Sequence, residues 1–146
     1  MLAVDWGQRR FGIAISDPTR LIAQPLTTLT RRPKQRPPVA GILELIGAHG
    51  VAAVVVGLPL TEAGAEGEAA RAARACGEAI AARSGLPVHY QDERMTTAHA
   101  LKSARRAGVA DRASRERLDQ MAAVGILQAW LDRNAGDRGT AAQRHG

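Results

Sequence analysis

The chain of 146 residues is poor in aromatic residues, at 3%, and contains one cysteine and two lysines. Its core must therefore be built from Ala, Val, Leu and Ile. The lone Cys76 excludes an intramolecular disulfide, which fits a reducing compartment, and we expect a cytoplasmic protein. No apolar run approaches the roughly 18 residues that a membrane helix needs, and Asp5 interrupts the place where a signal peptide would be apolar. We therefore expect neither a membrane span nor a secretory signal.

Positive charge is in excess. Twenty Lys and Arg residues stand against 14 Asp and Glu residues, which gives a net charge of +6 and a pI near 10.9. A domain pI above about 9 is typical of proteins that bind nucleic acid. A general preference for Arg over Lys would explain the type of cation but not the excess. The charge balance therefore favours nucleic acid as the partner.

Hydrophobic periodicity divides the chain into strands and helices. Short apolar runs between turn residues predict strands, and apolar residues spaced by three and four predict helices. The predicted strands cover residues 2–4, 10–16, 21–29, 51–56 and 86–91, and the predicted helices cover residues 39–49, 68–83, 96–106 and 118–131. We expect the highly charged residues 111–117 to be mobile and the polar residues 134–146 to form a disordered tail.

This order of elements predicts one α/β domain over residues 1–133. Short connections between the first three strands favour antiparallel pairing, and the later alternation of strands and helices favours parallel pairing. The expected architecture is a mixed five-stranded sheet whose first three strands are antiparallel, with helices on both faces. That is the order of the ribonuclease H-like fold.

Three acidic residues lie where a charge is expensive or unexpected. Asp5 ends the first strand, Glu93 follows the last strand, and Asp119 lies at the start of an apolar helix. Carboxylates that converge at the carboxyl ends of strands repel one another unless a cation neutralises them, and such oxygen ligands suit Mg²⁺ or Mn²⁺. We therefore predict that these three residues are catalytic metal ligands. The structural alternatives are a hydrogen-bonded turn residue for Asp5, a helix-start or salt-bridged surface residue for Glu93 and a favourable helix-terminal charge for Asp119.

Arginine residues adjoin the acidic positions in the sequence. Arg9, Arg10 and Arg94 are predicted to bind the substrate backbone, because a guanidinium group matches a phosphate with two parallel hydrogen bonds. The alternative is a structural pairing with Asp92 or Glu93. Asp92 itself is open between a metal ligand and a cap at the strand end.

Other motifs carry less chemistry. Gly57-Leu-Pro59-Leu60 leads from a strand toward a helix and could present backbone amides to an anion, but the chain has no Walker sequence. Asp17 precedes a proline and is expected to open a turn rather than to bind metal. The four histidines have no ligand spacing, so zinc is not expected.

Four blocks of the chain resemble the signature motifs of the YqgF (RuvX) family. They are Val4-Asp5-Trp-Gly7-Gln-Arg9-Arg10-Phe-Gly12-Ile-Ala-Ile-Ser-Asp17, Val56-Gly57-Leu-Pro59-Leu, Asp92-Glu93-Arg94-Met-Thr96-Thr97-Ala98 and Asp119-Gln-Met-Ala-Ala-Val. These bacterial proteins have a ribonuclease H-like fold and are described as Holliday junction resolvases and as nucleases that mature the 5′ end of 16S ribosomal RNA. By this resemblance, Asp5, Glu93 and Asp119 match the family's acidic catalytic set.

The expected function is that of a metal-dependent endonuclease acting on structured nucleic acid, either precursor ribosomal RNA or branched DNA. An ATP-binding phosphotransferase can open with a similar Asp-x-Gly hairpin, but it needs two such domains and the chain is too short. A non-catalytic RNA-binding factor in ribosome assembly is the alternative of another class. Such a factor would gain nothing from three carboxylates facing phosphate. The sequence leaves open a monomer or a homodimer.

Overall fold

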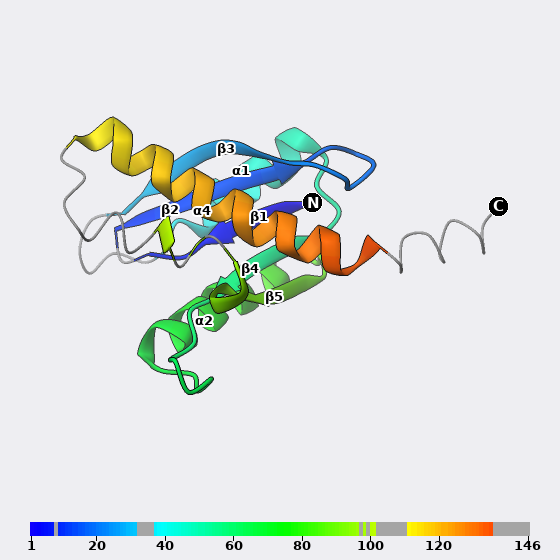
Figure 1. Ribbon diagram of the computed structural model, residues 1–146. Coiled ribbons are helices and arrows are strands. Elements are labelled where there is room, and N and C mark those ends of the chain that lie inside the picture. Colours follow the sequence, from blue (N-terminus) through cyan, green and yellow to red (C-terminus); the bar gives the residue numbers. More distant parts are fainter. Residues whose placement is uncertain (8, 32–36, 97, 99, 102–110, 136–146) are drawn as a thin grey trace.

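Five strands form one mixed sheet in the order β3-β2-β1-β4-β5 (Figure 1). The computed structural model describes residues 1–7, 9–31, 37–96, 98, 100–101 and 111–135. The pairings β1–β2 and β2–β3 are antiparallel, whereas β1–β4 and β4–β5 are parallel. This confirms the predicted mixed sheet. The strands are β1 (Leu2–Asp5), β2 (Arg10–Ser16), β3 (Ala23–Thr30), β4 (Val54–Leu58) and β5 (Val88–Asp92).

Helices cover both faces of the sheet, as predicted. The helices α1 (Val39–His49) and α2 (Glu68–Ser84) pack on one face, and α4 (Arg112–Arg133) crosses the other, drawn from yellow to orange in Figure 1. A short 3₁₀ helix, η1 (Glu93–Met95), follows β5 directly. Both core layers consist mainly of aliphatic side chains, since Phe11 is the one fully buried aromatic residue among those described.

The alternation along each strand decides which residues face α4. In β1, Leu2 and Val4 belong to the core layer beneath α1 and α2, while Ala3 belongs to the layer beneath α4. Because side chains of a strand point alternately to the two faces, Asp5 lies on the α4 face. The carboxyl ends of β1, β4 and β5 lie at the same edge of the sheet, since these strands are parallel.

Strand β4 is shifted from its predicted range of residues 51–56. The backbone N–H of Val51 bonds to the carbonyl of Ile46 and so completes the end of α1, where Gly50 adopts a left-handed conformation with φ of 59°. Pairing therefore begins only at Val54 and continues through Leu58. The shift brings Gly57 into the sheet.

Strands β3 and β5 also begin two residues later than predicted. Leu21 and Ile22 both donate their backbone N–H groups to Asp17 Oδ1, which holds them in the turn before β3. Before β5, Leu86 bonds to Ser84 and Pro87 has no N–H to donate. Local turn chemistry thus shortens both strands at their starts.

The expectation that residues 111–117 are mobile is wrong, because they form the first two turns of α4. Asp111 caps the helix by accepting hydrogen bonds from the backbone N–H and hydroxyl of Ser114, and Arg112 pairs with Glu116 one turn later. Thr28 of β3 donates its hydroxyl to the carbonyl of Glu116, which ties this segment to the sheet. Capping and tertiary contact outweigh the absence of large apolar residues.

Parts of two predicted segments lie outside the described residues. They are the helix predicted at 96–106, apart from residues 96, 98, 100 and 101, and the tail from residue 136 onward. Among the helices of the described residues, none has the length and apolar character needed to cross a membrane.

Candidate active site

Asp5 lies at the centre of a row of residues that crosses the α4 face of the sheet. On one side it pairs with Gly12 of β2. On the other side, the parallel pairing of Val4 with Val56 places the next residues, Asp5 and Gly57, side by side. Gly57 in turn pairs with Gln91 of β5. The central carboxylate is therefore flanked by two residues without side chains.

Gly12 is the point where α4 comes closest to the sheet. A Cβ atom at this position would overlap the backbone carbonyl of Asp119. Only glycine permits this approach, and it fixes Asp119 above the strand next to Asp5. Asp119 also lies seven residues after the start of α4, so the helix-terminal interpretation of this acid does not apply.

Gly57 makes the corresponding space for Glu93. A Cβ atom at Gly57 would lie 2.8 Å from Oε1 of Glu93 and would overlap the side chain of Ile126 from α4. The Glu93 carboxylate therefore lies over β4, on the same face as Asp5. The two glycines beside Asp5 each accommodate one of the other two predicted acids.

All three acids are buried. The exposed fractions are 2% for Asp5, 3% for Glu93 and 1% for Asp119, which argues against a surface ion pair for Glu93. Carboxylates are almost never fully buried unless they are paired or bind a metal. The structure thus brings the three predicted acids to one face and one end of the sheet, around Asp5.

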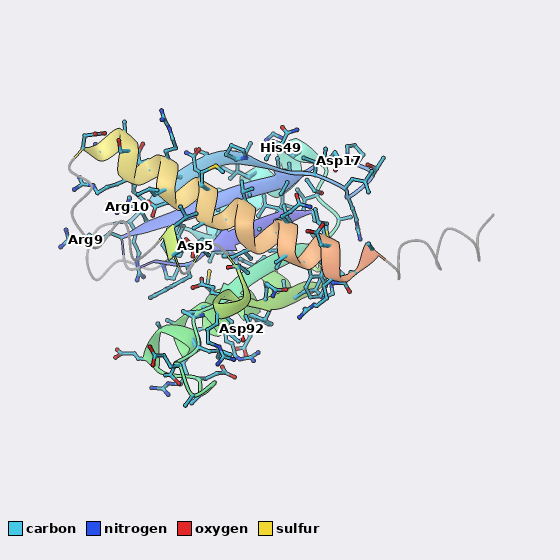
Figure 2. The ribbon with its side chains drawn as sticks, in the orientation of Figure 1. Asp5, Arg9, Arg10, Asp17, His49 and Asp92 are labelled. Carbon is cyan, nitrogen blue, oxygen red and sulfur yellow. The ribbon has the colours of Figure 1, made fainter. Side chains whose placement is uncertain are left out.

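Arg10 supplies positive charge to this group. Its Nε donates to Oδ2 of Asp119 at 2.6 Å, from β2 to α4. The Asp119 carboxylate is buried, while the Arg10 side chain is 24% exposed. Arg10 therefore reaches from the solvent to an acid of the site. Figure 2 shows Arg9 and Arg10 together at one end of the sheet, opposite the end that carries Asp17 and His49.

Arg94 is engaged elsewhere. Its guanidinium donates to both carboxylate oxygens of Asp92 and, through Nη1, to the backbone carbonyls of Thr61 and Glu62. Asp92 also accepts the backbone N–H of Arg94, so it caps the turn after β5 (labelled in Figure 2). The hydrogen bonds from the Arg94 side chain lower the pKa of Asp92 below its ordinary value. Arg94 thereby fastens the loop after β4 to the turn that carries Glu93.

The donor set fits a hard divalent cation, because it consists of carboxylate oxygens in a buried site. In the structure, however, no three acidic, histidine or cysteine side chains among the described residues form a group that could hold a metal ion. In this arrangement Asp119 is held by Arg10. Metal ligation by Asp5, Glu93 and Asp119 stays a prediction.

One polar residue of the row was missed by the sequence analysis. Gln91 is 2% exposed, and its Oε1 is a buried atom with no hydrogen-bond partner. The sequence signal was a polar residue at the end of the last predicted strand, two residues before Glu93. A buried amide oxygen beside buried acids is a further candidate donor.

Asp17 and Cys76 lie outside the site, and Asp17 opens a turn as predicted. Asp17 accepts hydrogen bonds from Leu21, Ile22 and Thr19, so it organises a turn, and the Ile22 bond is the largest of the causes that lower its pKa to about 2. Cys76 is a buried thiol on α2, and burial raises its pKa to about 11. A thiol with so high a pKa is a poor nucleophile.

Sequence comparisons relate this chain to known proteins. A sequence model of the RuvX family, described as Holliday junction resolvase, matches residues 1–133. A protein of Chloroflexus aggregans named "Putative pre-16S rRNA nuclease" is 44% identical over 90% of this chain and 92% of its own length. A protein of Moorella thermoacetica with the same name is 41% identical over 91% of this chain and 94% of its own length.

Solved structures show the same fold at low sequence identity. RuvC of Thermus thermophilus superposes with a TM-score of 0.55 and 17% identity, over 93% of this chain and 97% of that chain. The same protein in complex with its Holliday junction substrate gives a TM-score of 0.53 and 18% identity, over 91% and 95% of the two chains. The sheet order, the helices on both faces and these superpositions confirm the ribonuclease H-like fold. The family model and the two relatives each match about nine-tenths of this chain. The chain therefore belongs to the RuvX family of nucleases.

Proposed function

We propose that this chain is a divalent-metal-dependent endonuclease that cleaves phosphodiesters in structured nucleic acid, with 5′ maturation of precursor 16S ribosomal RNA as its role. One observation carries the proposal: three buried acids from the first strand, the turn after the last strand and α4 lie on one face of the sheet. A site of this kind costs stability, because carboxylates lose their hydration when they are buried. It therefore points to chemistry.

Asp5, Glu93 and Asp119 would hold Mg²⁺ or Mn²⁺. When bound, such an ion supplies Lewis-acid activation of water and of the scissile phosphate. Asp5 would be the central ligand, because the glycines on both sides leave its carboxylate open to the other two acids. Because the site is buried, water screens the charges in it weakly, and these charges interact strongly with one another.

The cationic residues would position the backbone of the substrate. Arg9 is exposed beside the site, and Arg10 has terminal guanidinium nitrogens that it can offer to a phosphate while its Nε holds Asp119. The predicted phosphate contact of Arg94 requires its guanidinium to leave Asp92 and the loop after β4. We therefore assign Arg94 a structural role, in which it shapes the site.

The choice of substrate rests on the relatives. Proteins 41 to 44% identical carry the pre-16S rRNA nuclease name, whereas the RuvC bound to a Holliday junction is 18% identical. The family description favours the second candidate, resolution of branched DNA. A resolvase needs two active sites and hence a homodimer, while trimming of RNA can be done by a monomer.

The test is cleavage of both substrates by the purified protein. A precursor 16S fragment and a four-way DNA junction are incubated with Mg²⁺, with Mn²⁺ or with a chelator, beside the Asp5→Asn variant. Metal-dependent cleavage of the RNA alone, lost in the variant, supports the proposal. Cleavage of the junction alone would favour the resolvase. Binding without cleavage of either substrate would favour the non-catalytic assembly factor.

A further inference from the structure

We propose that the side-chain oxygen of Gln91 is a fourth oxygen donor of the acidic site, contacting the bound cation directly or through one water. This inference rests on the proposed function, because it assigns a role toward the same cation. It adds a neutral ligand to the three acids predicted from the sequence.

The strand pairing places Gln91 at the site. It pairs with Gly57, and the carboxylate of Glu93 lies over this same glycine. Its neighbour two residues back, His89, stacks on Trp130 of α4 with ring centroids 4.5 Å apart. Residues two apart in a strand share a face, so Gln91 also points toward α4. Gln91 and Asp5 therefore flank Gly57 on the face that carries the acids.

The orientation of the amide is fixed by its nitrogen. Nε2 of Gln91 donates to the backbone carbonyl of Asp92 at 3.3 Å. The oxygen cannot exchange places with this nitrogen, because two acceptors would then face each other. Oε1 therefore points away from the Asp92 carbonyl, is buried, and has no hydrogen-bond partner in the structure.

A buried oxygen that accepts hydrogen bonds normally has a partner. Amide oxygens are suitable ligands for hard cations, as carboxylates are. An amide also has an advantage over a fourth acid here, since it adds a donor without adding to the repulsion among Asp5, Glu93 and Asp119. The competing explanation is a buried water that donates a hydrogen bond to Oε1 of Gln91 and has no part in cation binding.

The experiment measures Mn²⁺ affinity by calorimetry and the melting temperature without metal, for the wild type and three variants. Gln91→Leu removes the oxygen, and Gln91→Glu keeps the shape and adds a charge. Gln128→Leu is the matched control. This second glutamine bonds to Ala23, Leu21 and Asp132, and to none of the three acids of the site.

We expect Gln91→Leu to weaken Mn²⁺ binding by about 10-fold, within the range seen when residues supporting a metal site are removed. Its melting temperature without metal should stay equal or rise, because no unpartnered oxygen remains buried. Gln91→Glu should bind Mn²⁺ more tightly and melt lower without it. Gln128→Leu should melt lower and bind Mn²⁺ as the wild type does.

Two other outcomes separate this inference from the proposed function. Wild-type Mn²⁺ affinity in both Gln91 variants overturns the role of Gln91 and supports a structural water, while leaving the nuclease proposal intact. Failure of the wild type itself to bind Mn²⁺ overturns the metal-dependent function and, with it, this inference. Loss of folding in Gln91→Leu leaves Gln91→Glu, which preserves the volume of the side chain, to decide.

Discussion

Asp119 is a buried acid whose charge is balanced from outside the core by Arg10. Nε of Arg10 on β2 lies 2.6 Å from Oδ2 of Asp119 on α4, and the Asp119 side chain is only 1% exposed. A hydrogen bond between charged groups with one buried partner contributes more than a surface ion pair does. The pair therefore stabilises the docking of α4 and also prepares one acid of the site.

Replacement of Arg10 should expose this dependence. We expect Arg10→Ala to lower the free energy of unfolding by about 1.5–3 kcal/mol, the usual range for a hydrogen bond to a charged group. In an Asp119→Asn background the same replacement should cost clearly less. Urea unfolding of the four proteins forms a double-mutant cycle. Equal costs in both backgrounds would show that the pair does not stabilise the fold.

Asp5 can be tested by a change that keeps its volume. We expect Asp5→Asn to reduce cleavage to the level without enzyme, because it removes a hard anionic ligand. The melting temperature without metal should stay equal or rise, since repulsion from neighbouring acids is relieved. Cleavage assays and thermal unfolding measure the two effects. Full activity in this variant would refute the catalytic assignment.

At the scale of elements, the position of α4 depends on the absence of a side chain at Gly12. We expect Gly12→Ala to displace the helix and to destabilise the protein by about 2–4 kcal/mol, as severe overpacking does. The matched control is Gly47→Ala in α1, where a Cβ meets nothing within 4 Å. This control should stabilise by about 0.5–1 kcal/mol, the helix advantage of alanine. Chemical denaturation of both variants makes the comparison.

The turn between β2 and β3 should respond to acid. The pKa of Asp17 is lowered from 3.8 to about 2 by its backbone and hydroxyl hydrogen bonds. A group with a depressed folded-state pKa contributes stability that is complete above its unfolded pKa and is lost as the pH falls through the folded value. Wild-type stability should therefore fall between about pH 4 and pH 2 more steeply than that of Asp17→Asn. Urea midpoints across this range give the slopes, and parallel curves would contradict the assignment.

Local signals made most elements predictable. A short apolar run between turn residues predicted the full range of β2, and apolar residues spaced by three and four predicted that of α1. The start of α4 was missed because Arg112 to Arg117 contains no leucine, isoleucine or valine, and its stability comes from a cap and a contact with Thr28. Such tertiary contacts cannot be read from periodicity.

The acids of the candidate site stood out in the sequence, but their surroundings did not. Asp5, Glu93 and Asp119 stood out because acids in apolar contexts are rare. The pairing of Arg10 with Asp119 depends on where α4 docks, and the burial of Gln91 depends on the register of β4 with β5. Both follow from strand pairing and helix packing between segments distant in the sequence.

At the scale of the whole molecule, the net charge of +6 should govern affinity for nucleic acid. We expect Arg9→Ala to weaken binding of different sequences alike and to reduce the log–log salt slope on duplex DNA by about one unit. Arg94→Ala should instead lower stability, because its donors hold Asp92 and the loop after β4. Titrations at several salt concentrations decide between these roles. An unchanged slope for Arg9→Ala would assign the binding charge to other residues.

The close approach of Asp119 to Gly12 also has a consequence during synthesis. Asp119 is made more than a hundred residues after Asp5 and Gly12. A nascent chain can form the hairpin of β1 and β2 early, but it lacks an acid of the site until α4 has emerged and docked. If Asp119 is required for cleavage, as we propose, the protein stays inactive on the translating ribosome until α4 has emerged and docked.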